Sequence, residues 1–185
     1  MSTTRLVVLG AVRIFQPVHG YYVRRELMAW QVDEWANINP GSIYNALQAL
    51  TREGFLEEVD TRSGDRPGRT TYQLTADGES EFMTLLRAAL WHVETFDPQP
   101  IMASLCFMGA LSRQEVVDAL EHRIAEIDRR LAETEDDDQA VPLPPSTAPV
   151  FAREMEQLTT AWLLAEQEWT RVLVKRLENG EYVFG

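Results

Sequence analysis

One short predicted helix, between Asn39 and Gly54, limits the fold of this chain more than any other segment. Asn39 is a good N-cap residue, Pro40 suits the first helical position, and Gly54 ends the helix. At about 100° per residue, one side is apolar: Ile43, Leu47 and Leu50. The opposite side is small or polar: Ser42, Asn45, Ala49 and Arg52, with Gly41, Tyr44 and Gln48 on its flanks. Such a helix packs on one face and offers the other to a partner.

A predicted β-hairpin follows this helix. Residues 56–59 and 70–74 have strand character, and they flank the turn-rich residues 61–69. That turn contains glycine, proline and aspartate together with three arginines, Arg62, Arg66 and Arg69. The hairpin therefore has the character of a basic wing.

Two further helices are predicted before residue 31. Residues 6–15 are mostly apolar, and Gln16-Pro17-Val18-His19-Gly20 breaks the helix that they form. The second helix places Val23, Leu27 and Trp30 on one face, and residues 31–38 are expected to be a loop. Three helices followed by a two-stranded wing are the order of a winged helix-turn-helix domain.

The remaining residues predict an α-helical second half. Thr75 can cap a fourth helix that reaches Val93, residues 101–111 form a compact apolar segment, and Ser112 and Glu115 have the spacing of a capping box. The helix that this box opens has an apolar stripe: Val116, Leu120, Ile124, Ile127 and Leu131. Acidic and proline-rich residues 135–149 predict a solvated loop. We therefore expect a mainly α protein with a DNA-binding domain at 1–93, including its fourth helix, and a helical dimerisation domain at 94–185.

The last predicted helix, residues 150–178, carries a heptad seam. Its apolar or small positions follow steps of four and three: Phe151, Met155, Leu158, Trp162, Ala165, Trp169 and Val172. A seam of this kind packs against another helix, which residues 116–131 or a second subunit could supply. The two tryptophans and the second amphipathic helix favour dimerisation, through the six positions from Met155 to Val172.

The charge distribution separates the two halves. The net charge is −12, which by itself argues against a nucleic-acid partner. However, residues 1–75 contain eight arginines and eight acidic residues, so the whole excess lies in the second part. The first part can therefore concentrate positive charge on one face.

Composition narrows the remaining function classes. Cys106 is the only cysteine, which excludes an internal disulfide and fits the cytoplasm. No apolar run approaches the roughly 20 residues that span a bilayer, and the N-terminus lacks a signal-peptide pattern. The three histidines do not have metal-ligand spacing, and no catalytic motif or cofactor loop is present. We expect no metal, cofactor or enzyme activity.

Four ordered motifs resemble the PadR family of bacterial transcriptional regulators. They are Leu6-Val7-Val8-Leu9-Gly10, Pro17-Val18-His19-Gly20-Tyr21-Tyr22-Val23, Gly41-Ser42-Ile43-Tyr44-Asn45-Ala46-Leu47 and Arg69-Thr70-Thr71-Tyr72-Gln73-Leu74-Thr75. The match covers roughly residues 5–82, and the second half resembles the helical C-terminal domain of the longer, virulence-activator-like members. The resemblance implies a homodimer on a palindromic operator, mostly as a repressor, sometimes released by small aromatic or drug-like molecules. Many members have proline where this chain has Asn45, so operator preference does not transfer.

The candidate DNA contacts follow from residue chemistry. Ser42, Asn45 and Gln48 suit base edges in the major groove, and Tyr44 suits either a phosphate or packing against the second helix. Backbone contacts are expected from cationic side chains: Arg52, Arg24 or Arg25, and Arg66 and Arg69 in the wing, with Arg62 less favoured. The alternative for the helix is an ordinary solvated face.

A second candidate site is an effector pocket between the fourth helix and the dimer helices. Four aromatic residues could line it: Trp91, Phe107, Trp162 and Trp169. Aromatic residues at heptad spacing are also typical of an ordinary core.

We therefore predict a cytoplasmic, dimeric DNA-binding regulator, repressor rather than activator. One alternative is a winged protein-interaction module for a basic partner, which salt-insensitive association would indicate. The other is a small enzyme, for which the sequence offers no site.

Overall fold

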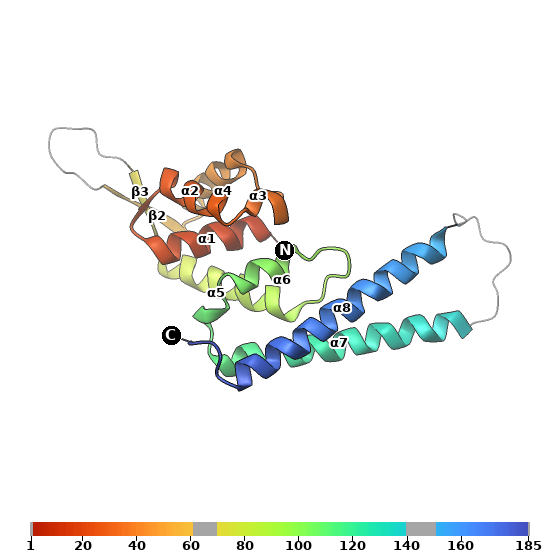
Figure 1. Ribbon diagram of the computed structural model, residues 1–185. Coiled ribbons are helices and arrows are strands. Elements are labelled where there is room, and N and C mark those ends of the chain that lie inside the picture. The colour runs from red at the N-terminus through yellow and green to blue at the C-terminus, as the bar shows by residue number, and fades with distance from the viewer. Residues whose placement is uncertain (1, 61–69, 140–150, 185) are drawn as a thin grey trace. The chain divides into compact units, whose positions relative to one another are not determined.

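The computed structural model describes residues 2–60, 70–139 and 151–184. The chain divides into two compact units (Figure 1). Unit 1 contains Met1–Ala89 and Gln99–Phe107, and unit 2 contains Leu90–Pro98 and Met108–Gly185. The chain therefore passes between the units three times, whereas the sequence suggested a single boundary at residue 93. In the described residues no helix is both long and apolar enough to cross a membrane.

Unit 1 is a winged helix-turn-helix domain, as predicted. Its helices are α1 (Thr3–Phe15), α2 (Gly20–Ala29), α3 (Val32–Trp35), α4 (Pro40–Arg52), most of α5 (Ala76–Trp91) and α6 (Gln99–Leu105). Its strands are β1 (Val18–His19), β2 (Leu56–Asp60) and β3 (Thr70–Leu74). The predicted cap of α5 is confirmed, because the Thr75 hydroxyl accepts a hydrogen bond from the Gly78 amide at 3.0 Å.

Helix α1 forms the centre of unit 1. Ser2 caps its first turn, and an almost continuous apolar run is completely buried: Leu6, Val7, Val8, Leu9, Ala11 and Val12. Helices α2, α4 and α6 and strand β3 all contact it. A helix that is apolar on nearly every side requires such surroundings, because any exposed face would leave apolar surface in water.

Two details of unit 1 differ from the prediction. The sheet has three antiparallel strands in the order β1-β3-β2, because Val18 and His19 of the expected helix break pair with Tyr72 and Thr71. The expected loop at 31–38 contains the one-turn helix α3. Two contacts stabilise this helical turn. Val32, its first residue, is buried, and Trp35 Nε1 donates a hydrogen bond to the Trp30 carbonyl oxygen at 2.9 Å.

Residues Gln99–Phe107, which belong to unit 1, place Phe107 in its core. Its ring centroid lies 5.7 Å from that of Phe82 and 5.9 Å from that of Trp30. Gly10 of α1 makes room for it, since a Cβ on Gly10 would lie 2.4 Å from the Phe107 ring. Residues 99–107 thus complete the first core and do not belong to the second.

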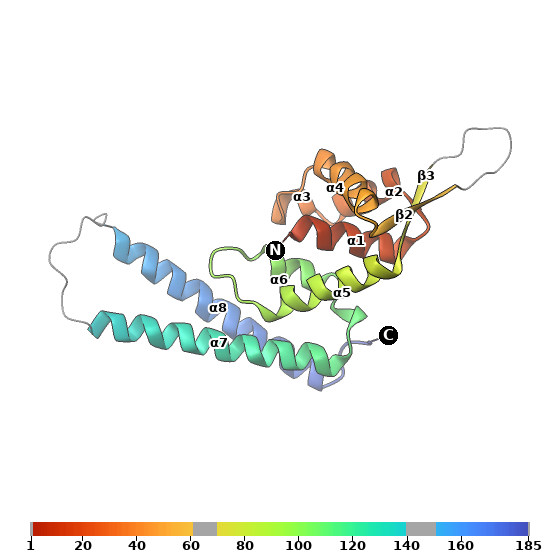
Figure 2. The ribbon, with the colours of Figure 1, turned by 180° about the vertical axis from the view of Figure 1, so that it is seen from behind.

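Unit 2 is built on a pair of long helices, α7 (Arg113–Gln139) and α8 (Ala152–Glu178), preceded by the 3-10 turn η1 (Met108–Ala110) (Figure 2). The capping box is confirmed: the Ser112 amide donates to Glu115 Oε2 at 2.9 Å, and the Glu115 amide donates to Ser112 Oγ at 3.2 Å. Helix α7 continues to Gln139, into residues predicted as loop, because no proline or glycine interrupts it before Pro142.

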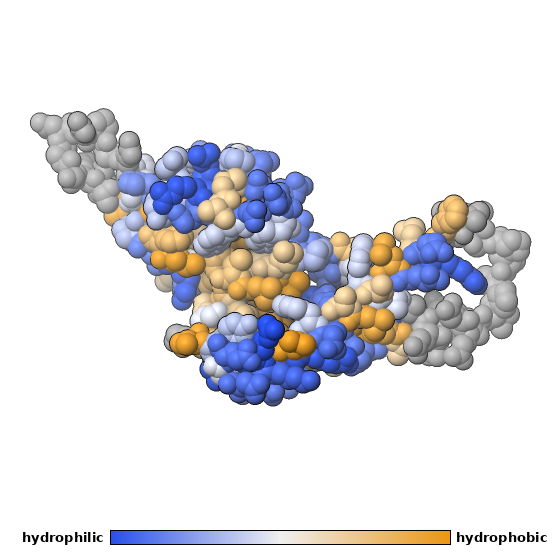
Figure 3. Space-filling model, viewed as in Figure 1, coloured by the Kyte–Doolittle hydropathy of each residue, from blue (hydrophilic) through white to orange (hydrophobic). Residues whose placement is uncertain are grey.

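The two long helices do not pack through the predicted seam. The face of α8 that is buried within the chain carries Leu163, Gln167, Thr170, Val174 and Leu177. The seam residues are exposed instead: Phe151 74%, Met155 67%, Leu158 51%, Trp162 51%, Trp169 39% and Val172 37%. Hydrophobic side chains along α8 are visible among hydrophilic ones in Figure 3. Of the two partners expected for the seam, α7 is therefore not the one that covers it.

Candidate nucleic-acid interface

Helix α4 has the two faces that its sequence predicts. Ile43, Leu47 and Leu50 are buried, and Asn45, Gln48 and Arg52 are exposed on the other side together with Tyr44, at 40% exposure. Ser42 and Ala49 are only half-buried. The most accessible strip thus consists of Gly41, Asn45, Gln48 and Arg52, in steps of four, three and four residues, with Tyr44 beside Asn45.

The N-cap of α4 fixes the position of the first turn of the helix. Asn39 Oδ1 accepts a hydrogen bond from the Ser42 amide at 2.9 Å, which holds the N-terminus of the helix in place. The Ser42 hydroxyl lies in that capped turn, whereas Asn45 and Gln48 extend from the middle of the helix. Asparagine and glutamine can each donate to and accept from one adenine edge in the major groove.

The cations of unit 1 differ in whether they already have partners. Arg5 pairs with Glu53 at 2.6 Å, and Arg13 pairs with Glu79 at 2.8 Å. Arg25 pairs with its neighbour Glu26 at 2.7 Å. Among the described residues, neither Arg24 nor Arg52 has a carboxylate within ion-pair distance.

The guanidinium groups of Arg24 and Arg25 are held in different ways. The Arg24 guanidinium carbon lies 5.3 Å from the Tyr21 ring centroid, and the buried Nε of Arg24 has no hydrogen-bond partner among the described residues. The guanidinium of Arg25 instead covers the Tyr22 ring at 4.1 Å and is held by Glu26, which raises the pKa of Arg25 through their hydrogen bond.

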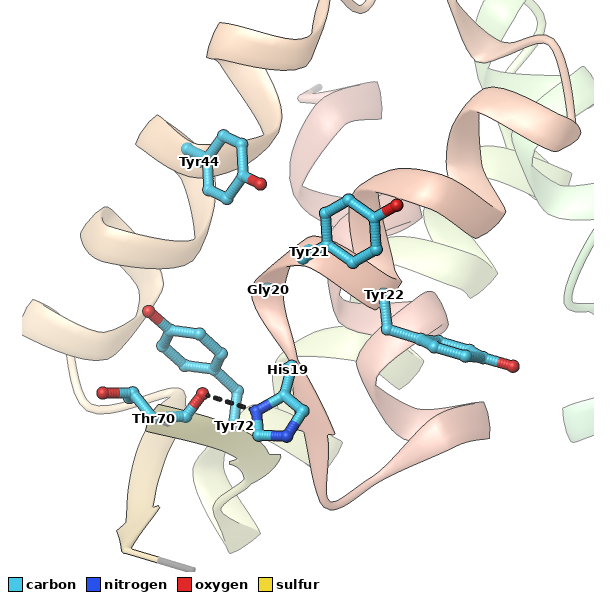
Figure 4. A pocket seen from close by; sticks show the side chains of 7 residues that line it. All are labelled: His19, Gly20, Tyr21, Tyr22, Tyr44, Thr70 and Tyr72. Atoms are coloured by element: carbon cyan, nitrogen blue, oxygen red, sulfur yellow. Dashed lines mark hydrogen bonds between the residues drawn. The ribbon is translucent and has the colours of Figure 1, made fainter. Parts of the chain in front are cut away.

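A cavity of about 780 Å³, which the sequence did not predict, adjoins helix α4. Its lining comes from α2, α4, β1 and β3 (Figure 4): His19, Gly20, Tyr21, Tyr22, Tyr44, Thr70 and Tyr72. The paired tyrosines after His19-Gly20 were visible in the sequence only as part of a family motif. Their meeting with Tyr44 and Tyr72 depends on the pairing of β1 with β3.

The floor of this cavity is fixed by close packing. A Cβ on Gly20 would lie 3.2 Å from Leu47 and 3.4 Å from Tyr72, so glycine lets α2 begin directly beneath the tyrosines. His19 Nδ1 is 3.1 Å from the Thr70 carbonyl oxygen. Burial raises the pKa of Tyr72, with further contributions from Glu58 and Tyr44, so its hydroxyl remains a donor.

The other predicted site residues lie elsewhere. Arg62, Arg66 and Arg69 fall outside the described residues. Of the proposed effector-pocket residues, Phe107 belongs to the core of unit 1, whereas Trp91, Trp162 and Trp169 belong to unit 2 and are exposed. Trp91 stacks on His122 with ring centroids 4.2 Å apart. The alternative of an ordinary core fits Phe107 but not the exposed tryptophans. In the described parts of the chain, no group of three or more His, Cys, Asp or Glu side chains could hold a metal ion.

Comparisons with solved structures give global similarities of low TM-score. A structure of Bacillus subtilis PadR in complex with operator DNA is 22% identical, with 94% of this chain and 98% of that chain covered and a TM-score of 0.40. One of Bacillus subtilis PadR in complex with p-coumaric acid is 19% identical, covering 96% and 99%, with a TM-score of 0.39. The PadR-like transcriptional regulator BC1756 from Bacillus cereus is 18% identical, covering 94% of each chain, with a TM-score of 0.37. No match was found among curated proteins.

The family comparison covers the module that carries the candidate interface. The model of the Transcriptional regulator PadR-like family matches residues 8–84, from α1 into α5. This match includes α4 and all but one of the family motifs in full, the exception being Leu6-Val7-Val8-Leu9-Gly10, whose first two residues precede it. Over residues 8–84 the chain is therefore similar to the PadR-like family of transcriptional regulators.

Proposed function

We propose that this protein is a sequence-specific DNA-binding repressor that acts in the cytoplasm. The observation that carries the proposal is the exposed polar strip of α4, opposite a fully buried apolar face, in a PadR-like module. Asn45 and Gln48 would contact base edges, and Arg52 and Arg24 would contact the flanking phosphates. Neither arginine has a carboxylate partner among the described residues, which supports this assignment.

The proposed regulator is a homodimer formed through the α8 seam. Six exposed apolar side chains in heptad register support a helical partner, and a second copy offers the same seam in return. Dimerisation would place two α4 helices on half-sites about one helical turn, roughly 34 Å, apart on a palindromic operator.

Relief of repression by a small aromatic effector is the regulatory part of the proposal. The exposed tryptophans of unit 2, Trp91, Trp162 and Trp169, are the residues that would contact such a molecule. An effector can release DNA only if it binds the DNA-incompetent arrangement more tightly, because equal affinity for both arrangements shifts nothing.

Footprinting on DNA upstream of its own gene, followed by binding titrations at several salt concentrations, tests the proposal. Operator binding should weaken steeply with salt, with a log–log slope of about −0.9 per phosphate contacted. A protected palindrome supports the operator assignment. Absence of any protected sequence, or the same affinity for all DNA, would contradict it.

The second candidate is a protein-interaction module that uses the α4 face. The acidic second half of the chain favours it, because negative charge attracts a basic partner. Failure to bind DNA, together with capture of a basic protein that Asn45→Ala abolishes, would favour this reading.

A further inference from the structure

The tyrosine cavity of unit 1 is continuous with the proposed reading face of α4. Tyr44 joins the two, since it lies beside Asn45 of the exposed strip of α4 and also lines the cavity. In Figure 4, Tyr44 and Tyr72 approach the start of α2 from two different elements, with Tyr21 beside them. Anything lying along the edge of the α4 strip would therefore pass over this cavity.

The chemistry of the lining identifies the class of ligand. Seven of the described residues line the cavity and none of these seven is acidic, in a chain whose net charge is −12. Tyrosine rings provide apolar faces, and tyrosine hydroxyls provide hydrogen-bond donors. Arg24, stacked on Tyr21, adds a cation without a carboxylate partner among the described residues.

A sugar–phosphate unit combines the same two properties. The deoxyribose ring is apolar on its carbon faces, and the phosphate accepts hydrogen bonds and carries negative charge. We propose that the cavity is the seat for one sugar–phosphate unit of the DNA strand that flanks the groove read by α4, with Tyr44 and Tyr72 donating to the phosphate. This inference rests on the proposed function and adds Tyr72, which lies on β3 and not on the reading helix.

Tyr72 is the residue that best tests the proposal. It lies on β3, so changing it leaves the residues of α4 unaltered. Its raised pKa, caused first by burial, keeps the hydroxyl protonated and able to donate. The carboxylate of Glu58, opposite Tyr72 in the β2–β3 ladder, contributes to that shift. A phosphate in the cavity would therefore accept a hydrogen bond from the neutral hydroxyl of Tyr72.

The test uses Tyr→Phe variants of the full-length protein, since phenylalanine keeps the ring and removes only the hydroxyl. Tyr72→Phe and Tyr44→Phe should each weaken binding to a duplex covering the protein's own footprint by about tenfold, the effect of one hydrogen bond to a charged group. The matched control is Tyr182→Phe, which should bind like the wild type. Tyr182 is an exposed tyrosine of unit 2 and does not line the cavity.

A second measurement identifies the phosphate itself. Single methylphosphonates, which remove the charge of one phosphate, are placed in turn along the same duplex. At one position the methylphosphonate should weaken binding by the wild type. The same substitution should not further weaken binding by Tyr72→Phe, because that variant already lacks the contact. The proposal would be overturned if Tyr72→Phe bound the unmodified duplex as tightly as the wild type does. It would also be overturned if every methylphosphonate weakened Tyr72→Phe as much as it weakens the wild type. If the wild type binds no duplex at all, the proposed function fails first.

Discussion

The buried guanidinium of Arg123 is held by Glu166 across the two long helices of unit 2. Nε of Arg123 donates to Glu166 Oε1 at 2.5 Å, and Nη1 donates to the His92 carbonyl oxygen at 2.5 Å. The Arg123 side chain is 1% exposed, whereas that of Glu166 is 22% exposed. Arg123 therefore joins α7, α8 and the segment that follows α5 through one buried charge.

Replacing Arg123 by alanine is expected to destabilise the protein by about 2–4 kcal/mol, because buried carbonyl groups lose their donor and the side-chain stem leaves a cavity. Urea unfolding followed by circular dichroism measures the loss. Arg129→Ala is the control, since Arg129 lies on the same helix and pairs with Glu126 and Glu133 but is 55% exposed. A measurable loss is not expected there. Equal losses in the two variants would show that burial of Arg123 is not what matters.

Gly10→Ala should destabilise unit 1 by about 1–3 kcal/mol, because the new methyl group would overlap the Phe107 ring in a closely packed core. Gly109→Ala is the control, since a Cβ at Gly109 meets no atom within 4 Å. Thermal unfolding compares the two. Adding Phe107→Leu to Gly10→Ala should recover part of the loss, and strict additivity of the two changes would argue against their contact.

Leu158→Glu should convert the proposed dimer into a monomer, since it places a charge in the middle of the heptad seam. Leu164→Glu is a closely matched control: the two leucines lie on α8 and are 51% and 50% exposed, but Leu164 is outside the seam. Sedimentation equilibrium gives the oligomeric state. Dissociation by both variants would indicate a different interface, and dissociation by neither would remove the seam from it.

Asn45→Ala should cost about 1–3 kcal/mol on the footprinted sequence and leave binding to random DNA nearly unchanged, because a base contact is lost. Arg52→Ala should weaken binding to both and lower the salt slope by about 1, because a phosphate contact is lost. Fluorescence anisotropy on the two duplexes at several salt concentrations separates these roles. If each variant affects both duplexes equally, the division between base and phosphate contacts is wrong.

The elements that local chemistry specifies were predictable from the sequence. Asn39 and Pro40 start α4, Thr75 caps α5, and Ser112 with Glu115 opens α7, because a cap depends on residues only three positions apart. The amphipathic face of α4 was equally predictable, since helical geometry alone places Ile43 opposite Asn45. These signals were sufficient for the winged helix-turn-helix assignment.

Contacts between distant segments needed the tertiary structure. The pairing of Val18 with Tyr72 turns an apparent helix break into a third strand and brings four tyrosines around one cavity. Phe107 returns to Gly10 across nearly a hundred residues, and α7 packs against the unpredicted face of α8. Periodicity shows that a helix has an apolar face, but it cannot show which neighbour will cover that face, because the neighbour is selected by the packing of the whole chain.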